Sequence, residues 1–262
     1  MATFITSTPV GESLMIDVTT STGYWKYNFN GTESSVFPDG NAVRSGAETN
    51  NGEYTVISCD VDGNASGEIT YLGLDNTYLT LFDGTGLSGL TNLNLTSNQL
   101  TSLSGFVFPT SLTNLQLQNN QLASFDGTSF TSLTTLNLAY NQLTSFDGTG
   151  LSSLTQLNLN LNPITSFNGT DLTSLFGLAL FDEKGVSSIT TSLNNSILSL
   201  LNTNGLENGY FLTGNGRTSA GTADYDALVG KGWNLRGLDL TGGNGGINIT
   251  GKLRIKGATT IG

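Results

Sequence analysis

A leucine-containing motif recurs along the middle of the chain at an almost constant spacing. This period restricts the possible folds more than any other feature of the sequence. Copies of the motif begin at Ile69, Leu90, Leu112, Leu133, Leu154 and Leu175. The steps between successive starts are 21, 22, 21, 21 and 21 residues. A fixed period in this range predicts a solenoid, in which every copy forms one coil that packs on the next.

Each copy alternates leucines with polar residues, as in "LTNLNLTSNQL" from Leu90. This alternation predicts a short strand whose leucines point into the core and whose polar residues point outward. The inward positions are Leu93 and Leu95, Leu115 and Leu117, Leu136 and Leu138, and Leu157 and Leu159. Asparagines that follow each strand predict a buried ladder that satisfies backbone groups; they are Asn98, Asn120, Asn141 and Asn162. The first and last copies have Thr77 and Glu183 there, which suits terminal coils.

The second half of each coil supplies the other side of the predicted core. Its large apolar residues are Phe82, Leu103, Phe125, Phe146 and Phe167, followed by Leu87, Phe108, Phe130, Leu151 and Leu172. Burial stabilises each by about 1.5–3 kcal/mol, so a stack of coils can fold where one coil cannot. The short, glycine-containing returns favour 3₁₀ turns or extended segments over full helices.

Over residues 69–181 this pattern resembles the leucine-rich repeat family, in particular the short bacterial repeats found in internalins. The resemblance implies a concave strand face that binds partners. Its predicted outward residues form one row of Asn94, Gln116, Asn137 and Asn158 and a second row of Ser97, Asn119, Tyr140 and Leu161. Tyr140 and Leu161 are the large apolar members and suit an anchor for a partner. The amides suit carbohydrate or a polar protein surface. The alternative is that the face is soluble and inert.

Different patterns flank the repeats. Residues 1–68 contain the alternating runs "SLMIDVTT", "YWKYNF" and "GEYTVISCDV", which predict a small β-sandwich. The order of these runs distantly resembles PKD-like, immunoglobulin-type modules that precede leucine-rich repeats in some phage and bacterial surface proteins. Such a module would cap the N-terminal end of the solenoid.

After the repeats, residues 182–240 predict a small α/β module. The run "SLNNSILSLLNTNG" predicts a helix with Asn or Ser as its cap and Gly205 as its stop, and "AGTADYDALVGKG" predicts a second helix. "NGYFLTG" and "WNLRGLDL" predict strands. The run resembles closing segments that follow such repeats in phage tail or virion proteins. Residues 241–262 predict a glycine-rich hinge and a C-terminal strand.

The expected fold class is therefore mainly β with a small α/β part. A leucine-rich-repeat solenoid of about six coils of 21–22 residues is capped by an N-terminal β-sandwich and a C-terminal α/β module.

The net charge of −11 argues against nucleic acid as a partner. Residues 1–68 carry a net charge of −7, residues 69–181 −5 and residues 182–262 +1, so the C-terminal part is electrostatically distinct. Lys252, Arg254 and Lys256 lie on one face of the predicted tail strand. They either protect an edge strand by charge or attach the chain to an acidic partner. No segment approaches the roughly 18 apolar residues of a membrane span, so membrane insertion is not expected.

The chain has few of the residue types that commonly carry out catalysis. The chain has no histidine, which removes the commonest general base, and its single cysteine, Cys59, suits a buried small hydrophobe. "FDGTG" at Phe146 is similar to the aspartic-protease "DTG" loop, but Gly148 interrupts it and related phrases recur in other coils. A turn is the better interpretation. We therefore expect no enzyme.

Two acidic stretches of the sequence are candidate cation sites. Asp126 and Asp147 would be neighbours on successive coils, about 4.8 Å apart, so a cation could bind between them. "DVDGNASGE" places Asp60, Asp62 and Asn64 at alternate positions, like the start of a calcium loop, although the rest of that loop pattern fails and a turn between strands fits as well. No cofactor is expected, and Ca²⁺ is the one candidate.

The leading functional hypothesis is a bacteriophage virion structural protein displayed on the particle as a capsid decoration or a tail or fibre component. Only 11% of residues are charged, a composition typical of exposed proteins rich in uncharged polar side chains. The N-terminal sequence lacks a standard secretory signal, and a virion protein assembles in the host cytoplasm. Expected partners are other virion proteins and a host-surface glycan or protein, with a homo-oligomer left open. The alternative is a bacterial cell-surface adhesin or carbohydrate-binding module at the cell surface.

Overall fold

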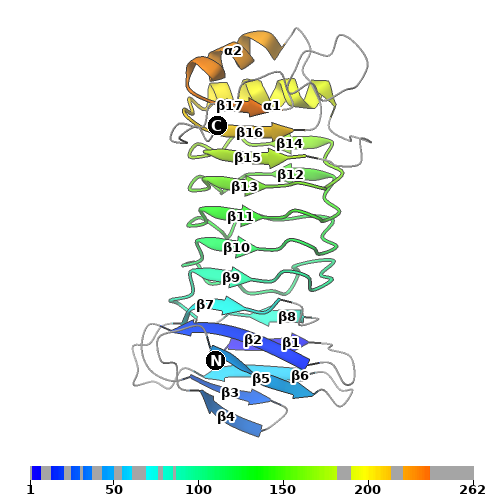
Figure 1. Ribbon diagram of the computed structural model, residues 1–262, viewed down its shortest axis with the longest axis vertical. Coiled ribbons are helices and arrows are strands. Elements are labelled where there is room, and N and C mark those ends of the chain that lie inside the picture. Colours follow the sequence, from blue (N-terminus) through cyan, green and yellow to red (C-terminus); the bar gives the residue numbers. More distant parts are fainter. Residues whose placement is uncertain are drawn as a thin grey trace, which may run out of the picture.

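The computed structural model describes the solenoid and its C-terminal extension in detail. The described ranges are residues 69–75, 79–84, 87–181, 190–213 and 221–236. Of residues 1–68, it describes the backbone of six strands. Figure 1 shows the strands stacked as rungs along the long axis, with the helices at one end and the N-terminal strands at the other.

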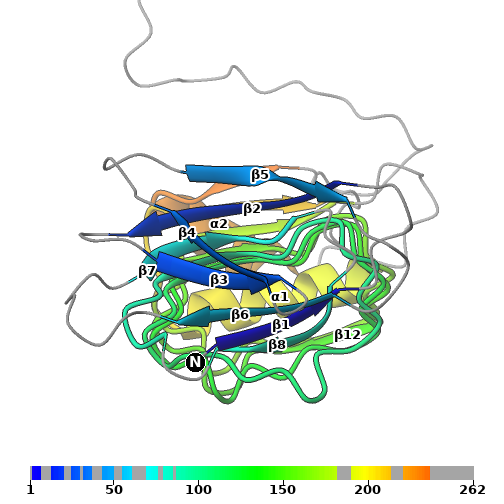
Figure 2. The same ribbon diagram turned by 90° about the horizontal axis from the view of Figure 1, so that it is seen from below.

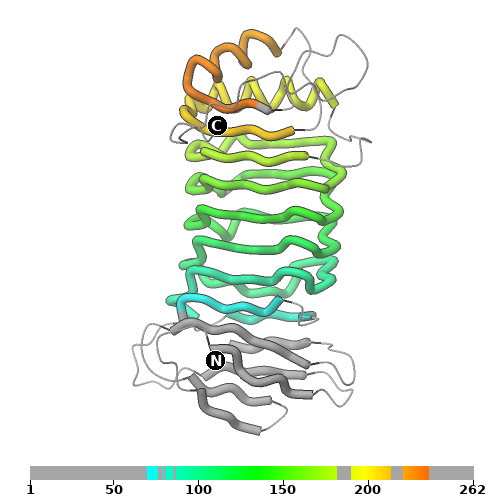
Figure 3. The backbone as a smooth tube through the Cα atoms, viewed as in Figure 1, coloured from blue at the N-terminus to red at the C-terminus, as the bar shows by residue number. Residues whose placement is uncertain are grey.

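The repeats form one parallel sheet along this axis. Its strands are β7 (Ile69–Gly73), β9 (Asn92–Asn94), β10 (Asn114–Gln116), β11 (Thr135–Asn137), β13 (Gln156–Asn158) and β15 (Gly177–Leu180). The register places Leu93 beside Leu115 and Leu115 beside Leu136, so equivalent residues of successive coils are direct neighbours. The tube in Figure 3 follows these coils from rung to rung. The predicted solenoid is confirmed for this part of the chain.

The C-terminal segment adds two further strands to the same sheet. Helix α1 (Thr191–Thr203) leads to β16 (Tyr210–Thr213), and α2 (Thr222–Gly230) leads to β17 (Asn234–Arg236). Both strands pair in parallel, β16 with β15 and β17 with β16. The predicted helices and strands are confirmed.

One detail of helix α1 differs from the prediction. The N-cap is Thr190, whose hydroxyl accepts a hydrogen bond from the backbone N–H of Leu193. The predicted Asn or Ser cap is therefore wrong, because the helix begins before those residues. Gly205 does follow the helix with a φ of 70°, as a stop residue should.

The N-terminal strands extend both faces of the solenoid. They are β1 (Ala2–Thr6), β2 (Ser13–Thr20), β3 (Trp25–Phe29), β4 (Thr32–Val36), β5 (Val43–Thr49) and β6 (Thr55–Asp60). Strand β2 pairs antiparallel with β7, and β1 pairs antiparallel with β8 (Leu79–Asp83). Viewed along the stack, β2 and β5 lie on one side, and β1, β6 and β8 on the other (Figure 2). Strands β2, β3 and β6 match predicted runs, whereas β1, β4 and β5 were not predicted.

The core lies between the parallel sheet and the returns. The predicted inward leucines are at most 2% exposed. Opposite them, phenylalanine rings contact one another from coil to coil: Phe82, Phe106, Phe108, Phe130, Phe125, Phe146 and Phe167 form a continuous column with centroids 5.0–6.5 Å apart. Residues 87–181 contain no helix, and their returns include the short parallel strands β12 (Ser145–Asp147) and β14 (Ser166–Asn168). The prediction of turns or extended returns is confirmed there.

The predicted asparagine ladder is present and buried. Asn98, Asn120, Asn141 and Asn162 are 3–7% exposed. Each amide oxygen accepts a backbone N–H from the preceding coil; that of Asn141, for example, accepts from Leu122 at 2.9 Å. The amide nitrogen of Asn141 donates to the carbonyls of Leu117 and Leu138, which lie in the preceding coil and its own. Thr77 and Glu183 lie outside the described residues.

Candidate interaction surface

The first predicted row lies on the outer face of the parallel strands, as expected. Asn94, Gln116, Asn137 and Asn158 are all half-buried. The amide oxygens of Asn137 and Asn158 accept hydrogen bonds from the backbone N–H groups of Ala139 and Asn160, each at 3.1 Å. These amides therefore shape the turn after each strand, and their nitrogens keep the capacity to donate outward.

The second predicted row occupies a special backbone position. Ser97, Asn119, Tyr140 and Leu161 have φ values of 56–58°. The backbone N–H of Tyr140 donates to the carbonyl of Asn160 in the next coil, and that of Leu161 donates to Phe181, both at 2.8 Å. The backbone hydrogen bonds between coils thus fix the left-handed conformation at this position, whichever residue occupies it. Tyr140 is 51% exposed, whereas Leu161 is half-buried.

A threonine ladder along the opposite end of the strands was missed by the sequence analysis. The hydroxyl of Thr113 donates to the carbonyl of Thr91, that of Thr134 to Thr113, and that of Thr155 to Thr134, at 2.9–3.1 Å. These threonines directly follow the first leucine of each copy, so the recurring "LT" pair was the available signal.

An aromatic group ends this threonine ladder and was also missed. Where the next threonine would stand, the chain has Phe176, which is 45% exposed. Its ring meets the ring of Tyr210 edge to face, with centroids 6.0 Å apart. The hydroxyl of Tyr210 donates to the side-chain oxygen of Gln156. The break in the repeat at "LFGLAL" was the signal in the sequence.

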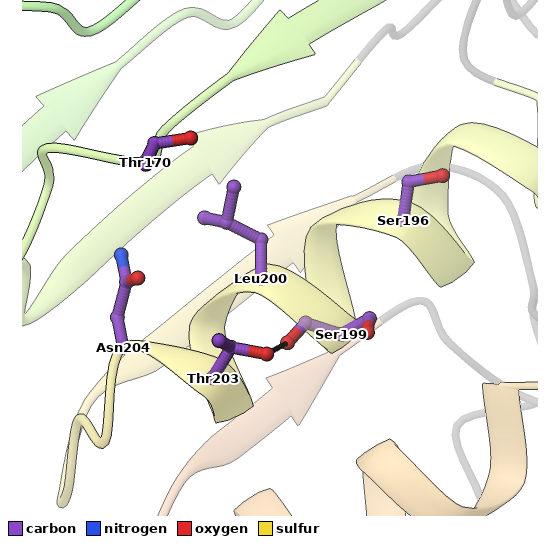
Figure 4. A pocket seen from close by; sticks show the side chains of 6 residues that line it. All are labelled: Thr170, Ser196, Ser199, Leu200, Thr203 and Asn204. Carbon is purple, nitrogen blue, oxygen red and sulfur yellow. Dashed lines mark hydrogen bonds between the residues drawn. The ribbon is translucent and has the colours of Figure 1, made fainter.

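A pocket lies between helix α1 and the turn that follows β14 (Figure 4). It is lined by Thr170, Ser196, Ser199, Leu200, Thr203 and Asn204. Several of its polar groups form hydrogen bonds within the protein: the Thr203 hydroxyl donates to the carbonyl of Ser199, and the Asn204 amide donates to that of Gly169. The Asn204 bond holds helix α1 against the turn that follows β14.

The aspartates of the returns stabilise turns. Asp147 accepts hydrogen bonds from the side-chain hydroxyl and backbone N–H of Thr149, which hold the pKa of its carboxyl below the ordinary value. Asp126 makes the same two bonds with Thr128; the backbone bond contributes most to lowering its pKa. The amide of Asn168 also donates to Asp147, at 3.0 Å. The turn interpretation of the Asp-Gly phrases is thus confirmed for Asp126 and Asp147.

Cation binding at these and the other candidates stays a prediction. Within the described part of the chain, no three acidic or cysteine side chains gather as a metal site would require. Asp60 ends strand β6, whereas Asp62 and Asn64 lie outside the described residues. The side chain of Cys59 and the residues Lys252, Arg254 and Lys256 also lie outside them.

Comparisons with known proteins bear on the repeats. Residues 110–164 match the family model described as leucine rich repeat. Among curated proteins, no sequence is similar enough to count as a relative. Among the described residues, no helix is long and apolar enough to cross a membrane.

A solved structure similar to this chain is the functional domain of InlJ from Listeria monocytogenes, which includes a cysteine ladder. The two are 21% identical, and the match covers 55% of this chain and 43% of the InlJ chain, with a TM-score of 0.25. The chain thus spans less than half the length of that protein.

Proposed function

We propose that the chain is a non-enzymatic interaction scaffold displayed on the surface of a bacteriophage particle, as a capsid decoration or a tail or fibre component. Its outer strand face contacts a partner, and Tyr140 is the anchor of that contact. One observation carries the proposal: Tyr140 is 51% exposed at a backbone position that a large side chain occupies at a cost.

The cost follows from the left-handed conformation. A bulky residue pays roughly 1–2 kcal/mol there, whereas glycine or asparagine is tolerated. Asn119 fills the equivalent position in the preceding coil, so asparagine suits the coil geometry. Packing within the chain stabilises a half-exposed aromatic ring too little to offset this strain. Contact of the ring with a partner supplies the missing stabilisation, because aromatic residues are frequent interface anchors.

The virion location rests on the sequence. The chain obtains its solubility mainly from uncharged polar side chains, and a single cysteine forms no intramolecular disulfide, which suits assembly in a reducing cytoplasm. Residues 1–68 resemble PKD-like modules, and the segment after the repeats resembles closing segments of phage proteins. Lys252, Arg254 and Lys256 attach the chain to an acidic partner among the other virion proteins, either as a monomer or as a homo-oligomer.

Mass spectrometry of purified particles tests the location. We expect the chain to copurify with particles through a density gradient at a fixed ratio to the major capsid protein. Absence from particles, or presence on bacterial cells alone, would overturn the virion role and favour a cell-surface adhesin.

Particles that lack the chain allow the attachment to be tested separately. Purified full-length chain should bind them, and the combined variant Lys252→Glu, Arg254→Glu and Lys256→Glu should not. Equal binding of both proteins would remove the role of these cations.

Tyr140→Asn should reduce binding of the chain to host cells by about tenfold and leave attachment to particles unchanged. Unchanged binding to cells would remove Tyr140 as the anchor.

A further inference from the structure

We propose that Tyr210, Phe176 and Gln156 form a subsite for a neutral oligosaccharide at the C-terminal end of the parallel sheet. The inference rests on the proposed function in one respect, namely that this sheet contacts a partner. It adds the chemical class of a ligand and a location separate from Tyr140.

Tyr210 lies across a neighbouring strand. It stands beside Gly177 in the register of β16 and β15, and Gly177 stands beside Gln156 in the register of β15 and β13. The Tyr210 hydroxyl nevertheless donates to Gln156, so the side chain reaches over β15 to the second strand away. A Cβ on Gly177 would collide with both the tyrosine ring and the glutamine oxygen. Glycine at this position makes the crossing possible.

The ring is held in place before any ligand arrives. The hydrogen bond to Gln156 fixes its tip, and the edge-to-face contact with Phe176 fixes its side, with an interplanar angle of 89°. Trp233, whose ring lies close to Gly209, is 4% exposed and donates its indole N–H to the carbonyl of Leu206. A preorganised aromatic group loses less conformational entropy on binding than a mobile one.

The parallel strands beside this cluster carry mostly uncharged polar residues on their outer face. The outward positions on strands β9, β10, β11, β13 and β15 hold Asn92, Asn94, Asn114, Gln116, Thr135, Asn137, Gln156, Asn158, Gly177 and Ala179. The acidic residues of residues 87–181 are Asp126, Asp147 and Asp171, and none of them lies on these strands. The outward positions of these five strands offer no compensating charge to a cationic or an anionic ligand, and the nearest charged residue in the register is Arg236 on β17, which pairs with Leu212 of β16.

A neutral oligosaccharide fits both parts of the surface. The C–H groups on one face of a sugar ring carry partial positive charge and pack on the negative face of an aromatic ring. Its hydroxyl groups both donate and accept hydrogen bonds, as do the amides of the neighbouring strands. A peptide could also contact aromatic rings, but its backbone and charged side chains would use this amide-lined, uncharged face less fully.

The test uses the full-length chain and a panel of neutral gluco- and chito-oligosaccharides beside sialylated and sulfated ones. Ligand-observed NMR saturation transfer detects binding, and calorimetry measures the Kd. We expect binding among the neutral compounds only. Tyr210→Ala should weaken it about tenfold, which corresponds to loss of one aromatic contact. Phe176→Ser should weaken it several-fold.

Phe176 is 45% exposed and its replacement disturbs the core less, so Phe176→Ser keeps the test valid even if Tyr210→Ala fails to fold. Val229→Ser is the matched control, because Val229 is a similarly exposed apolar residue on helix α2, away from the sheet. No binding by any neutral oligosaccharide at millimolar concentration, preference for charged glycans, or unchanged binding in Phe176→Ser would overturn the inference. Binding of a protein partner through Tyr210 in place of glycans would do so as well.

The two proposals fail in different ways. A chain present in virions that binds no glycan overturns the oligosaccharide subsite alone. A chain absent from virions that binds neutral glycans through Phe176 overturns the virion role alone.

Discussion

The side-chain oxygen of Asn120 accepts a hydrogen bond from the backbone N–H of Leu100, one coil earlier, at 2.9 Å. It also accepts the N–H of Asn98, while the Asn120 amide nitrogen donates to the carbonyls of Leu95 and Leu117. One buried side chain therefore satisfies four backbone groups and joins two coils.

Replacing this side chain should destabilise the solenoid strongly. Asn120→Ala removes hydrogen bonds from four buried backbone groups, of which the Leu117 carbonyl keeps its bond from Asn141, and we expect the free energy of unfolding to fall by roughly 2–4 kcal/mol. Urea denaturation followed by circular dichroism measures the loss. Gln121→Ala, at an exposed neighbouring position, is the control and should change stability by less than about 0.5 kcal/mol. Equal effects of the two substitutions would contradict the role of the ladder.

Tyr140→Asn should increase stability. The substitution removes a bulky side chain from a left-handed position at which φ is 56°, and we expect a gain of about 1 kcal/mol in the same urea experiment. The reverse exchange in the preceding coil, Asn119→Tyr, should cost a similar amount. A loss of stability in Tyr140→Asn would show that the ring packs within the chain, and the case for an interface anchor would then fail.

Gly209→Ala should destabilise the end of the sheet. A Cβ at this position would lie 2.5 Å from the carbonyl oxygen of Phe176 and 2.6 Å from the ring of Trp233. Relief of this overlap should cost about 1–3 kcal/mol. Gly230→Ala is the matched control, because a Cβ there meets no atom within 4 Å. The two melting temperatures should differ, with Gly209→Ala the lower; similar values would refute the close packing.

Acid should release the bond between Asp147 and Thr149. Because folding lowers the pKa of Asp147 below its ordinary value of 3.8, the bond contributes fully above that pH and is lost as the pH falls through the folded-state pKa. Thr149→Val removes the hydroxyl, so the pKa should rise toward the ordinary value. Carbon-detected NMR titration of the Asp147 carboxyl reports this pKa.

Thr165→Val is the control for this titration. The Thr165 hydroxyl donates to the carbonyl of Thr144, so its removal should leave the pKa of Asp147 as it is. If Thr149→Val also leaves that pKa unchanged, the hydroxyl is not the cause of the shift.

The period of the repeats was enough to predict the strands and the ladder. Each coil encodes its own fold locally, because Leu115 and Leu117 point inward by alternation and Asn120 follows where the chain must turn. Neighbouring coils then repeat the pattern, so its register needs no long-range information. The helix near Leu198 was predicted for the same reason, since its apolar spacing is local.

The remaining features depend on contacts between distant segments. The pairing of β2 with β7 and of β1 with β8 joins strands with no repeated motif, so periodicity carries no sign of it. The contact between Tyr210 and Gln156 joins residues 54 positions apart and requires a glycine on the strand between them. The outward amides were placed correctly, but alternation could not show that Asn137 uses its oxygen on its own turn.

The order of the sheet from β5 to β17 has a mechanical consequence. The hydrogen bonds between strands run along the long axis of the stack (Figure 1), so a pull on its two ends stretches successive strand pairs in series. A series yields at its weakest member, and the pairs of three-residue strands such as β9 and β10 are short. The buried amide of Asn120 forms hydrogen bonds across the same boundary between the β9 and β10 coils. These bonds therefore carry part of the tension between the two coils.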